Sequence, residues 1–86
     1  MHRYFFQLHY ATRDVADQEV TELDGHDEAK TEAKAIIVEL VAASFKRKRE
    51  FDLISVRILN PEGDLLAEVF SREVLAEMIS PEIITI

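Results

Sequence analysis

Three histidines and a group of acidic residues are the side chains of this sequence best suited to bind a metal ion. His2, His9 and His26 do not form the H-x-x-x-H or H-E-x-x-H spacing of a helical metal site. The acidic stretch 14–19 lacks the glycine and the final glutamate of a calcium-binding EF-hand loop. The chain has no cysteine, which excludes disulfides, thiolate ligands and a cysteine nucleophile. We therefore expect no metal and no cofactor.

Carboxylates are the other candidate catalytic groups, because a buried pair of them can act as general acid and base. Seven of the seventeen lie in residues 14–28, a strongly acidic stretch that we expect to be exposed. No serine, histidine and acid can be assigned to convergent elements, and the two glycines, Gly25 and Gly63, form no phosphate-binding motif. We therefore expect no catalytic residues and no enzymatic activity.

The charges of the chain are unevenly distributed. The formal net charge of −7 argues against non-specific nucleic-acid binding, whose affinity comes from lysine and arginine at the phosphates. Residues 46–49, however, are all basic. We favour the interpretation that they complement the negative end of a helix dipole. The alternative is a local nucleic-acid patch together with one arginine further along the chain. The residues of that candidate patch are Lys46, Arg47, Lys48, Arg49 and Arg57.

One long helix, from about Asp24 to Arg49, is the element that must position these charges. Asp24 suits its N-cap, because the carboxylate can accept an amide hydrogen of the first turn. A stripe of apolar residues recurs in steps of three and four, the spacing of one helix face, at Ala29, Ala33, Ile36, Leu40 and Ala43, with Ile37 and Val41 beside them. We expect this stripe to cover a sheet, with Ile36, Ile37 and Leu40 packed against Phe6, Leu8 and Val56.

A second apolar stripe runs along roughly the opposite side of the same helix. Its members are Thr31, Ala35, Val38, Ala42 and Phe45. A helix that only covers a sheet needs one apolar stripe, so the second one indicates that the helix is covered from both sides. The alternative is that the alanines are present as good helix formers and that Phe45 folds under the neighbouring hairpin.

Before this helix, alternating side chains predict two strands. Arg3–Tyr10 places Tyr4, Phe6 and Leu8 on one face. A turn is expected at residues 11–14. The acidic segment Val15–Leu23 is expected to form a short, exposed second strand, since charge on an edge strand discourages unwanted pairing.

After the helix, the pattern predicts a hairpin. Leu53–Asn60 should place Ile54, Val56 and Ile58 on one face. Asn60-Pro61-Glu62-Gly63 has the chemistry of a type I turn, and Leu65–Phe70 is the return strand. Ser71 can cap a short helix, Arg72–Ile79, which Pro81 ends, and the tail Glu82–Ile86 is β-prone.

The order β-β-α-β-β-α predicts an α+β fold in a single domain, residues 1–86. An antiparallel sheet of about four strands would pack on one long helix. The other face of the sheet would still carry apolar side chains, so the C-terminal helix, the tail or a second subunit should cover part of it. These apolar side chains are Phe5, Leu59, Leu66 and Phe70, and we expect them beside Arg3, Gln7, Arg57 and Glu68 on the same face.

The opening strand R-Y-F-F-Q-L, Arg3 to Leu8, resembles the R-Y-F-F-H-L start of a family of small bacterial domains of unknown function. The resemblance extends to about residue 79, through the acidic segment, the alanine-rich helix and the final hairpin. Gln7 stands where that family has histidine, and Val20 stands where it usually has glycine before the E-L pair at Glu22 and Leu23. The resemblance supports the fold and does not add any activity to it.

We therefore expect a small homodimeric interaction domain, an adaptor or regulatory protein without catalysis, whose further protein partner the sequence does not identify. Its contact would be the second helix stripe or the far face of the sheet. Nucleic-acid association is the alternative. No apolar run is long enough to cross a membrane, and the N-terminus shows no secretion signal, so we expect a cytoplasmic protein. The candidate interface residues are Ala35, Val38, Ala42, Phe45, Phe5, Leu66 and Phe70.

Overall fold

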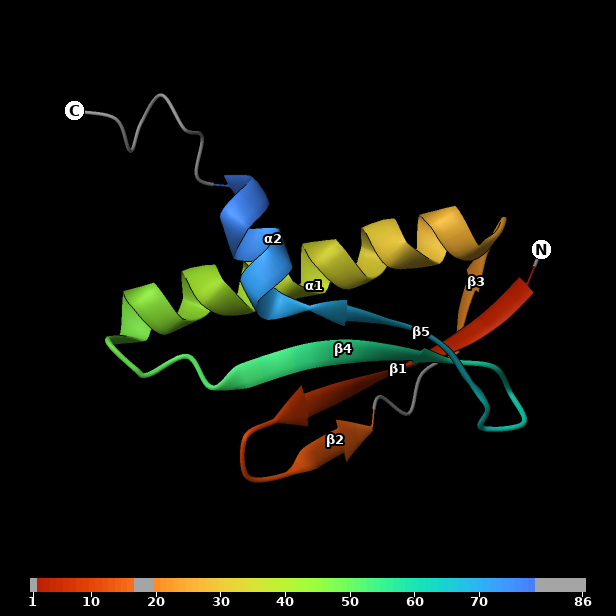
Figure 1. Cartoon of the computed structure of the whole chain (residues 1–86), viewed down its shortest axis with the longest axis horizontal. Coiled ribbons are helices and arrows are strands. Elements are labelled where there is room, and N and C mark those ends of the chain that lie inside the picture. The colour runs from red at the N-terminus through yellow and green to blue at the C-terminus, as the bar shows by residue number, and fades with distance from the viewer. Residues whose placement is uncertain (1, 17–19, 79–86) are drawn as a thin grey trace.

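The computed structural model describes residues 2–16 and 20–78 (Figure 1). Helix α1 lies across one face of an antiparallel sheet, and helix α2 lies against α1 on the same side of the sheet (Figure 1). The expected α+β fold, with one long helix packed on an antiparallel sheet, is confirmed. The elements are β1 (His2–Tyr10), β2 (Asp14–Ala16), β3 (Thr21–Leu23), α1 (His26–Arg47), β4 (Leu53–Leu59), β5 (Leu65–Phe70) and α2 (Ser71–Met78).

β1 and β4 are the central strands of the sheet, whose order is β2-β1-β4-β5. The short strand β3 pairs with β1 on the same edge as β2, but nearer the start of β1. The expected single strand Val15–Leu23 is therefore wrong in one respect, since the segment forms two short strands. Ala16 pairs with Gln7 and Thr21 pairs with Tyr4. The stretch from Ala16 to Thr21 is therefore longer than the stretch of β1 that it faces, and pairing cannot continue without a break. Residues 17–19 lie outside the described part of the chain.

The core lies between α1 and the sheet. On the strands Tyr4, Phe6, Val56 and Ile58 are at most 2% exposed. On the helix, the buried residues are Ala29, Ala33, Ile37 and Val41, a row with a step of four. The small alanines let the first half of α1 lie close to the sheet. The expected face does pack on the sheet, but Ile37 is at its centre, whereas Ile36 and Leu40 lie on its flank and are only partly buried.

The two ends of α1 differ from the sequence expectation. The N-cap is Gly25, not Asp24, and no side chain caps it. Instead, the Asp24 amide donates to the Glu28 carboxylate at 3.2 Å. At the other end, Lys48 adopts a left-handed conformation with φ of 53°, and the amides of Lys48 and Arg49 donate to the carbonyls of Phe45 and Ser44. This is the helix-ending pattern that usually contains glycine.

The hairpin between β4 and β5 has the predicted turn. The Gly63 amide donates to the Asn60 carbonyl at 2.9 Å, and Gly63 has a φ of 89°. Within β4, however, Ile54 is 41% exposed instead of facing the core with Val56. A register shift opposite Leu53 interrupts the alternation there, and Leu53 is buried in its place.

The expected cap of the last helix is also wrong. Because α2 follows β5 directly, Ser71 is already part of its first turn. The Ser71 hydroxyl is buried and has no hydrogen-bond partner among the described residues. Val74 is the buried anchor of α2, whereas Met78 is exposed. Ile79 and the tail Glu82–Ile86 lie outside the described part of the chain.

Candidate functional site

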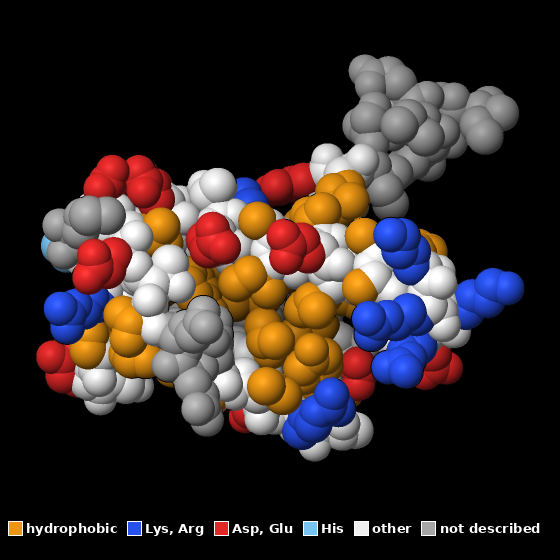
Figure 2. Space-filling view, turned by 180° about the vertical axis from the view of Figure 1, so that it is seen from behind, with side chains coloured by type: hydrophobic (Ala, Val, Ile, Leu, Met, Phe, Trp, Pro, Cys, Tyr) orange, Lys and Arg blue, Asp and Glu red, His pale blue; other side chains and the backbone are white. Residues whose placement is uncertain are grey.

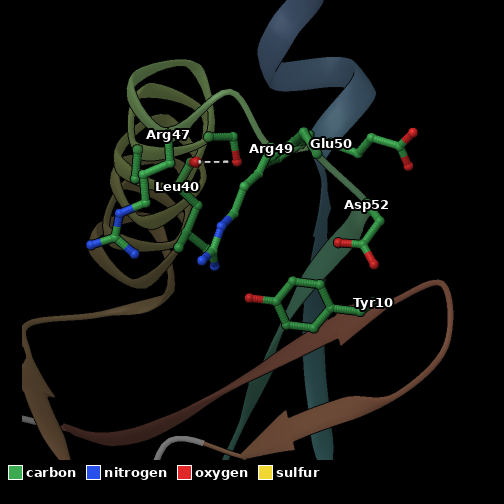
Figure 3. Close-up of a pocket in the computed structure, with 9 residues that line it drawn as sticks. Tyr10, Leu40, Arg47, Arg49, Glu50 and Asp52 are labelled. Carbon is green, nitrogen blue, oxygen red and sulfur yellow. Dashed lines mark hydrogen bonds between the residues drawn. The ribbon is translucent and has the colours of Figure 1, made fainter.

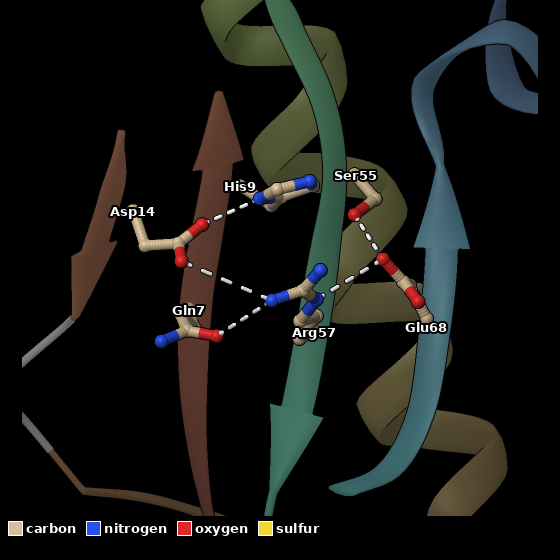
Figure 4. Close-up of polar contacts among 6 residues, drawn as sticks. All are labelled: Gln7, His9, Asp14, Ser55, Arg57 and Glu68. Carbon is tan, nitrogen blue, oxygen red and sulfur yellow. Dashed lines mark hydrogen bonds and ion pairs between the residues drawn. The ribbon is translucent and has the colours of Figure 1, made fainter. Parts of the chain in front are cut away.

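The open face of the sheet, away from α1, carries a network of polar side chains that spans four strands (Figure 4). Every member is at a position where strand alternation points side chains away from the core. The helix lies behind this network in the view of Figure 4. Its members are Gln7 and His9 on β1, Asp14 on β2, Ser55 and Arg57 on β4, and Glu68 on β5.

Arg57 is the centre of this network. Its Nε lies 3.2 Å from Glu68 Oε2, and its Nη1 lies 3.5 Å from Gln7 Oε1 and 3.9 Å from Asp14 Oδ2. The Ser55 hydroxyl donates to the same Glu68 oxygen at 2.5 Å. The hydrogen bond from Ser55, followed by that from Arg57 and its positive charge, lowers the pKa of the Glu68 carboxyl, although burial opposes the change.

His9, Asp14 and Ser55 lie on neighbouring strands, a convergence that the sequence analysis could not assign. His9 Nδ1 lies 2.5 Å from Asp14 Oδ1, and Ser55 pairs with His9 across β1 and β4. The Ser55 side chain is nevertheless fully buried, and its hydroxyl donates to Glu68. The arrangement therefore joins the strands and offers no exposed serine hydroxyl.

The apolar residues of the open face are less exposed than the sequence suggested. Leu66 is 38% exposed, while Phe5, Leu59 and Phe70 are half-buried. The expectation that the C-terminal helix covers this face is wrong for the described part of α2. That helix packs against α1 on the other side of the sheet, where Lys34 and Glu77 form an ion pair at 3.4 Å.

The second apolar stripe of α1, which we call the outer stripe, faces solvent. It comprises Ala35, Val38, Ala42 and Phe45, all of which are exposed. Phe45 is 79% exposed, so it does not fold under the hairpin. Beside it lies a largely apolar hollow of about 220 Å³ between α1, the segment before β4 and α2. This hollow is lined by Val41, Ser44, Phe45, Arg49, Phe51 and Leu75.

The basic end of α1 is arranged differently from the candidate nucleic-acid patch. Lys46, Arg47, Lys48 and Arg49 are exposed, but Arg57 is on the open face and bound to Glu68. A cavity of about 230 Å³ lies instead between this end and the end of β1 (Figure 3). Tyr10 and Phe51 line it together with Arg47 and Arg49.

Tyr10 and Phe51 line this cavity but were not among the site residues predicted from the sequence. Arg13 lies over the Tyr10 ring, 4.5 Å from its centre. A signal was available, because β4 starts soon after the basic cluster and pairs antiparallel with β1, which brings the last residue of β1 to the end of the helix. It was not usable before the strand order was known.

A band of hydrophobic side chains lies between α1 and the strands β1 and β2 (Figure 2). The same view shows lysine and arginine side chains beyond one end of the band. The band exists because Ile36 and Leu40, expected in the core, lie on the flank of the buried row. The partly exposed apolar residues of these elements are Leu8, Tyr10, Val15, Ile36 and Leu40.

In residues 2–16 and 20–78, no group of three or more histidine, cysteine or acidic side chains could hold a metal ion. In the same residues, no helix has the length and apolar character needed to cross a membrane.

The chain matches a family model described as a domain of unknown function, DUF6894, over residues 3–72. No curated protein and no solved structure is similar enough to match it. The match covers β1 to the first residues of α2. It therefore includes the sheet with its polar network, and α1 with its basic end. The chain belongs to this family of domains of unknown function.

Proposed function

We propose that the protein is a small interaction domain without catalytic activity, which pairs with a second copy of itself through the outer stripe of α1. A two-fold dimer is the commonest form of such an assembly. The observation that carries the proposal is the exposure of Phe45, a large apolar side chain at 79% on a surface that no described element covers. Large exposed apolar groups in a row indicate an interaction surface.

The stripe has a shape that suits a second helix. Alanines at Ala35 and Ala42 allow close approach, while Val38 and Phe45 project between them. In an antiparallel pair centred between Val38 and Ala42, these two residues meet across the two-fold axis. Phe45 then lies against Ala35 of the second copy.

The charges of α1 support the antiparallel arrangement. Its first turn contains Asp27 and Glu28, and its last turn contains Lys46 and Arg47. Antiparallel pairing brings the acidic half of each helix towards the basic end of the other, and places Glu32 near Lys46 of the second copy. Opposite charges that meet in this way set the orientation of the pair more than its strength.

The open face of the sheet is a poorer contact surface. Its centre is the polar network, in which the side chains of Arg57 and Glu68 are still 29% and 21% exposed. A second copy seated there would remove the remaining water from these charges, and that loss of hydration opposes binding. The outer stripe contains no charged residue.

A dimer of this kind would act as an adaptor or regulatory protein by presenting its remaining surfaces twice. The absence of cysteine is compatible with the reducing cytoplasm of a bacterial cell, where we expect the protein to act.

The test compares two charge-introducing variants by light scattering. Val38→Glu combined with Ala42→Glu places acids in the outer stripe, whereas Leu66→Glu places one on the open face. We expect a dimer for the wild type and for Leu66→Glu, and a folded monomer for the stripe variant. A wild type that is monomeric at high micromolar concentration would refute self-association. A dimeric stripe variant together with a monomeric Leu66→Glu would move the contact to the sheet.

A second candidate function is association with nucleic acid. It is favoured by one observation, that the fold places Tyr10 and Phe51 beside Arg47 and Arg49. Aromatic rings among basic side chains are typical of surfaces that bind single strands. Fluorescence anisotropy with a labelled oligonucleotide at low and moderate salt tests this function, and no binding at low salt would exclude it.

A further inference from the structure

The cavity at the basic end of α1 has walls of two kinds (Figure 3). One wall is apolar and includes Leu40, Ala43 and Phe51, together with the Tyr10 ring. The other consists of charged side chains at and just after the end of α1, among them Arg47 and Arg49. A site with one apolar wall and one charged wall fits a ligand that is itself divided in this way.

The positive charges of the cavity are available to a ligand. The guanidinium groups of Arg47 and Arg49 form no ion pair with any carboxylate of the described residues. In Figure 3 both side chains extend in the same direction, and Arg49 points towards the hydroxyl end of Tyr10. Arg13, which lies over the Tyr10 ring, adds a third guanidinium nearby. Planar guanidinium groups bind phosphate oxygens in pairs and also stack on rings.

Two acidic residues, Glu50 and Asp52, also line the cavity. The Glu50 carboxylate points away from Tyr10, whereas Asp52 lies towards the backbone end of that residue, away from Arg49 (Figure 3). At the helix end, the carbonyls of Ser44 and Phe45 accept amide hydrogens from Arg49 and Lys48. The charges left facing the hydroxyl end of Tyr10 are therefore positive.

We infer that this cavity binds a small ligand that contains both a phosphate group and a flat aromatic ring, such as a mononucleotide. Arg47 and Arg49 would hold the phosphate, and the ring would lie against the apolar wall of Tyr10, Leu40 and Phe51. The cavity volume of about 230 Å³ suits a small ligand. The inference is independent of dimer formation, because the cavity shares no residue with the outer stripe.

The experiment measures binding of AMP, inorganic phosphate and adenosine to the full chain by calorimetry at low salt. AMP should bind at least about tenfold more tightly than either fragment, since each lacks one half of the ligand. Arg49→Gln and Arg47→Gln should each weaken AMP binding about 10- to 100-fold, as expected for lost hydrogen bonds to a charged group. Asp52→Asn should tighten it several-fold, because it removes a repelling charge.

Arg72→Gln is the matched control, since it removes an exposed arginine of α2 outside the cavity. It should leave AMP affinity unchanged, and circular dichroism should show that all variants are folded. Equal weakening by Arg72→Gln and Arg49→Gln would overturn the site, because binding would then reflect overall charge. Inorganic phosphate that binds as tightly as AMP would overturn the role of the ring. Binding of an oligonucleotide without any binding of AMP would overturn the cavity site altogether.

Discussion

Phe5 and Phe6 are neighbours of the same type on opposite faces of one strand, and they have different surroundings. Phe6 is 1% exposed beneath α1, whereas Phe5 lies half-buried on the open face. The covered face is apolar throughout its centre, while the centre of the open face is the network around Arg57. The comparison teaches that the two faces are stabilised by different forces. Apolar burial against α1 holds one, and charged hydrogen bonds between strands hold the other.

The largest expected effect separates the two phenylalanines. Phe6→Ala should lower the free energy of unfolding by about 3–5 kcal/mol, because it removes a buried ring and leaves a cavity. Phe5→Ala should cost less than about half of that, since its ring is already partly in water. Urea unfolding followed by circular dichroism measures both. Equal losses for the two variants would show that the open face is also a packed core, for example beneath a second subunit.

A smaller effect is expected at the centre of the open face. Glu68→Ala leaves the buried Ser55 hydroxyl and the Arg57 guanidinium without their acceptor, which should cost about 1–3 kcal/mol. The control is Glu62→Ala in the exposed turn of the hairpin, which should change stability by no more than about 0.5 kcal/mol. If both substitutions cost the same, the network would contribute no specific stability.

The pH dependence of stability tests the same network without removing the side chain. The pKa of Glu68 is lowered from its ordinary value of 4.5, so the unfolded chain takes up the proton more readily than the folded chain. The ionised carboxylate therefore stabilises the fold above the ordinary pKa, and this contribution is lost as the pH falls through the lowered pKa of the folded state.

Glu68→Gln cannot titrate, so it provides the reference for this measurement. The difference in unfolding free energy between the wild type and Glu68→Gln should be largest near neutral pH and should decrease in acid. A difference that stays constant across the acid range would contradict a stabilising role for the Glu68 charge.

The smallest expected effect comes from a residue outside both faces of the sheet, and it is a gain in stability and not a loss. Lys48→Gly should raise the unfolding free energy by about 0.5–1 kcal/mol, because glycine adopts the left-handed conformation of this position without steric cost. Lys46→Gly, inside the last turn of α1, should lower it by about 0.5–1 kcal/mol. Thermal unfolding of the pair measures both changes. A loss of stability in both would show that the Lys48 side chain makes a contact that matters more than its backbone strain.

Features that depend on neighbouring residues were predictable from the sequence. The turn at Asn60 to Gly63 was predicted because its conformation depends on the local chemistry of proline and glycine. The long helix was also predicted, because apolar spacing is a property of the helix alone. These elements were enough to indicate the α+β fold.

Features that depend on pairing between distant segments were not predictable. Arg57 was grouped with residues 46–49 because it is basic and close in sequence. Strand alternation also placed it on the far face of the sheet, but its contact with Glu68 depends on the pairing of β4 with β5. The cavity residue Tyr10 was missed for the same reason, since only the pairing of β1 with β4 brings it to the helix end. Ile36 and Leu40 were assigned to the core because periodicity does not show how a helix is rotated over its sheet.

The pairing of β1 with β4 also determines the order in which the chain can fold. These central strands lie on opposite sides of α1 in the sequence, so their contact closes a loop that contains β2, β3 and the whole helix. Closing a long loop is entropically costly, and its cost precedes the gain from the contacts. The helix and the β4–β5 hairpin are local and form quickly, so we expect the arrival of β1 at β4 to be the slow step of folding. Until then the unpaired backbone groups along the edge of β4 are open to other chains. The protein concentration during refolding therefore decides how many molecules reach the native state.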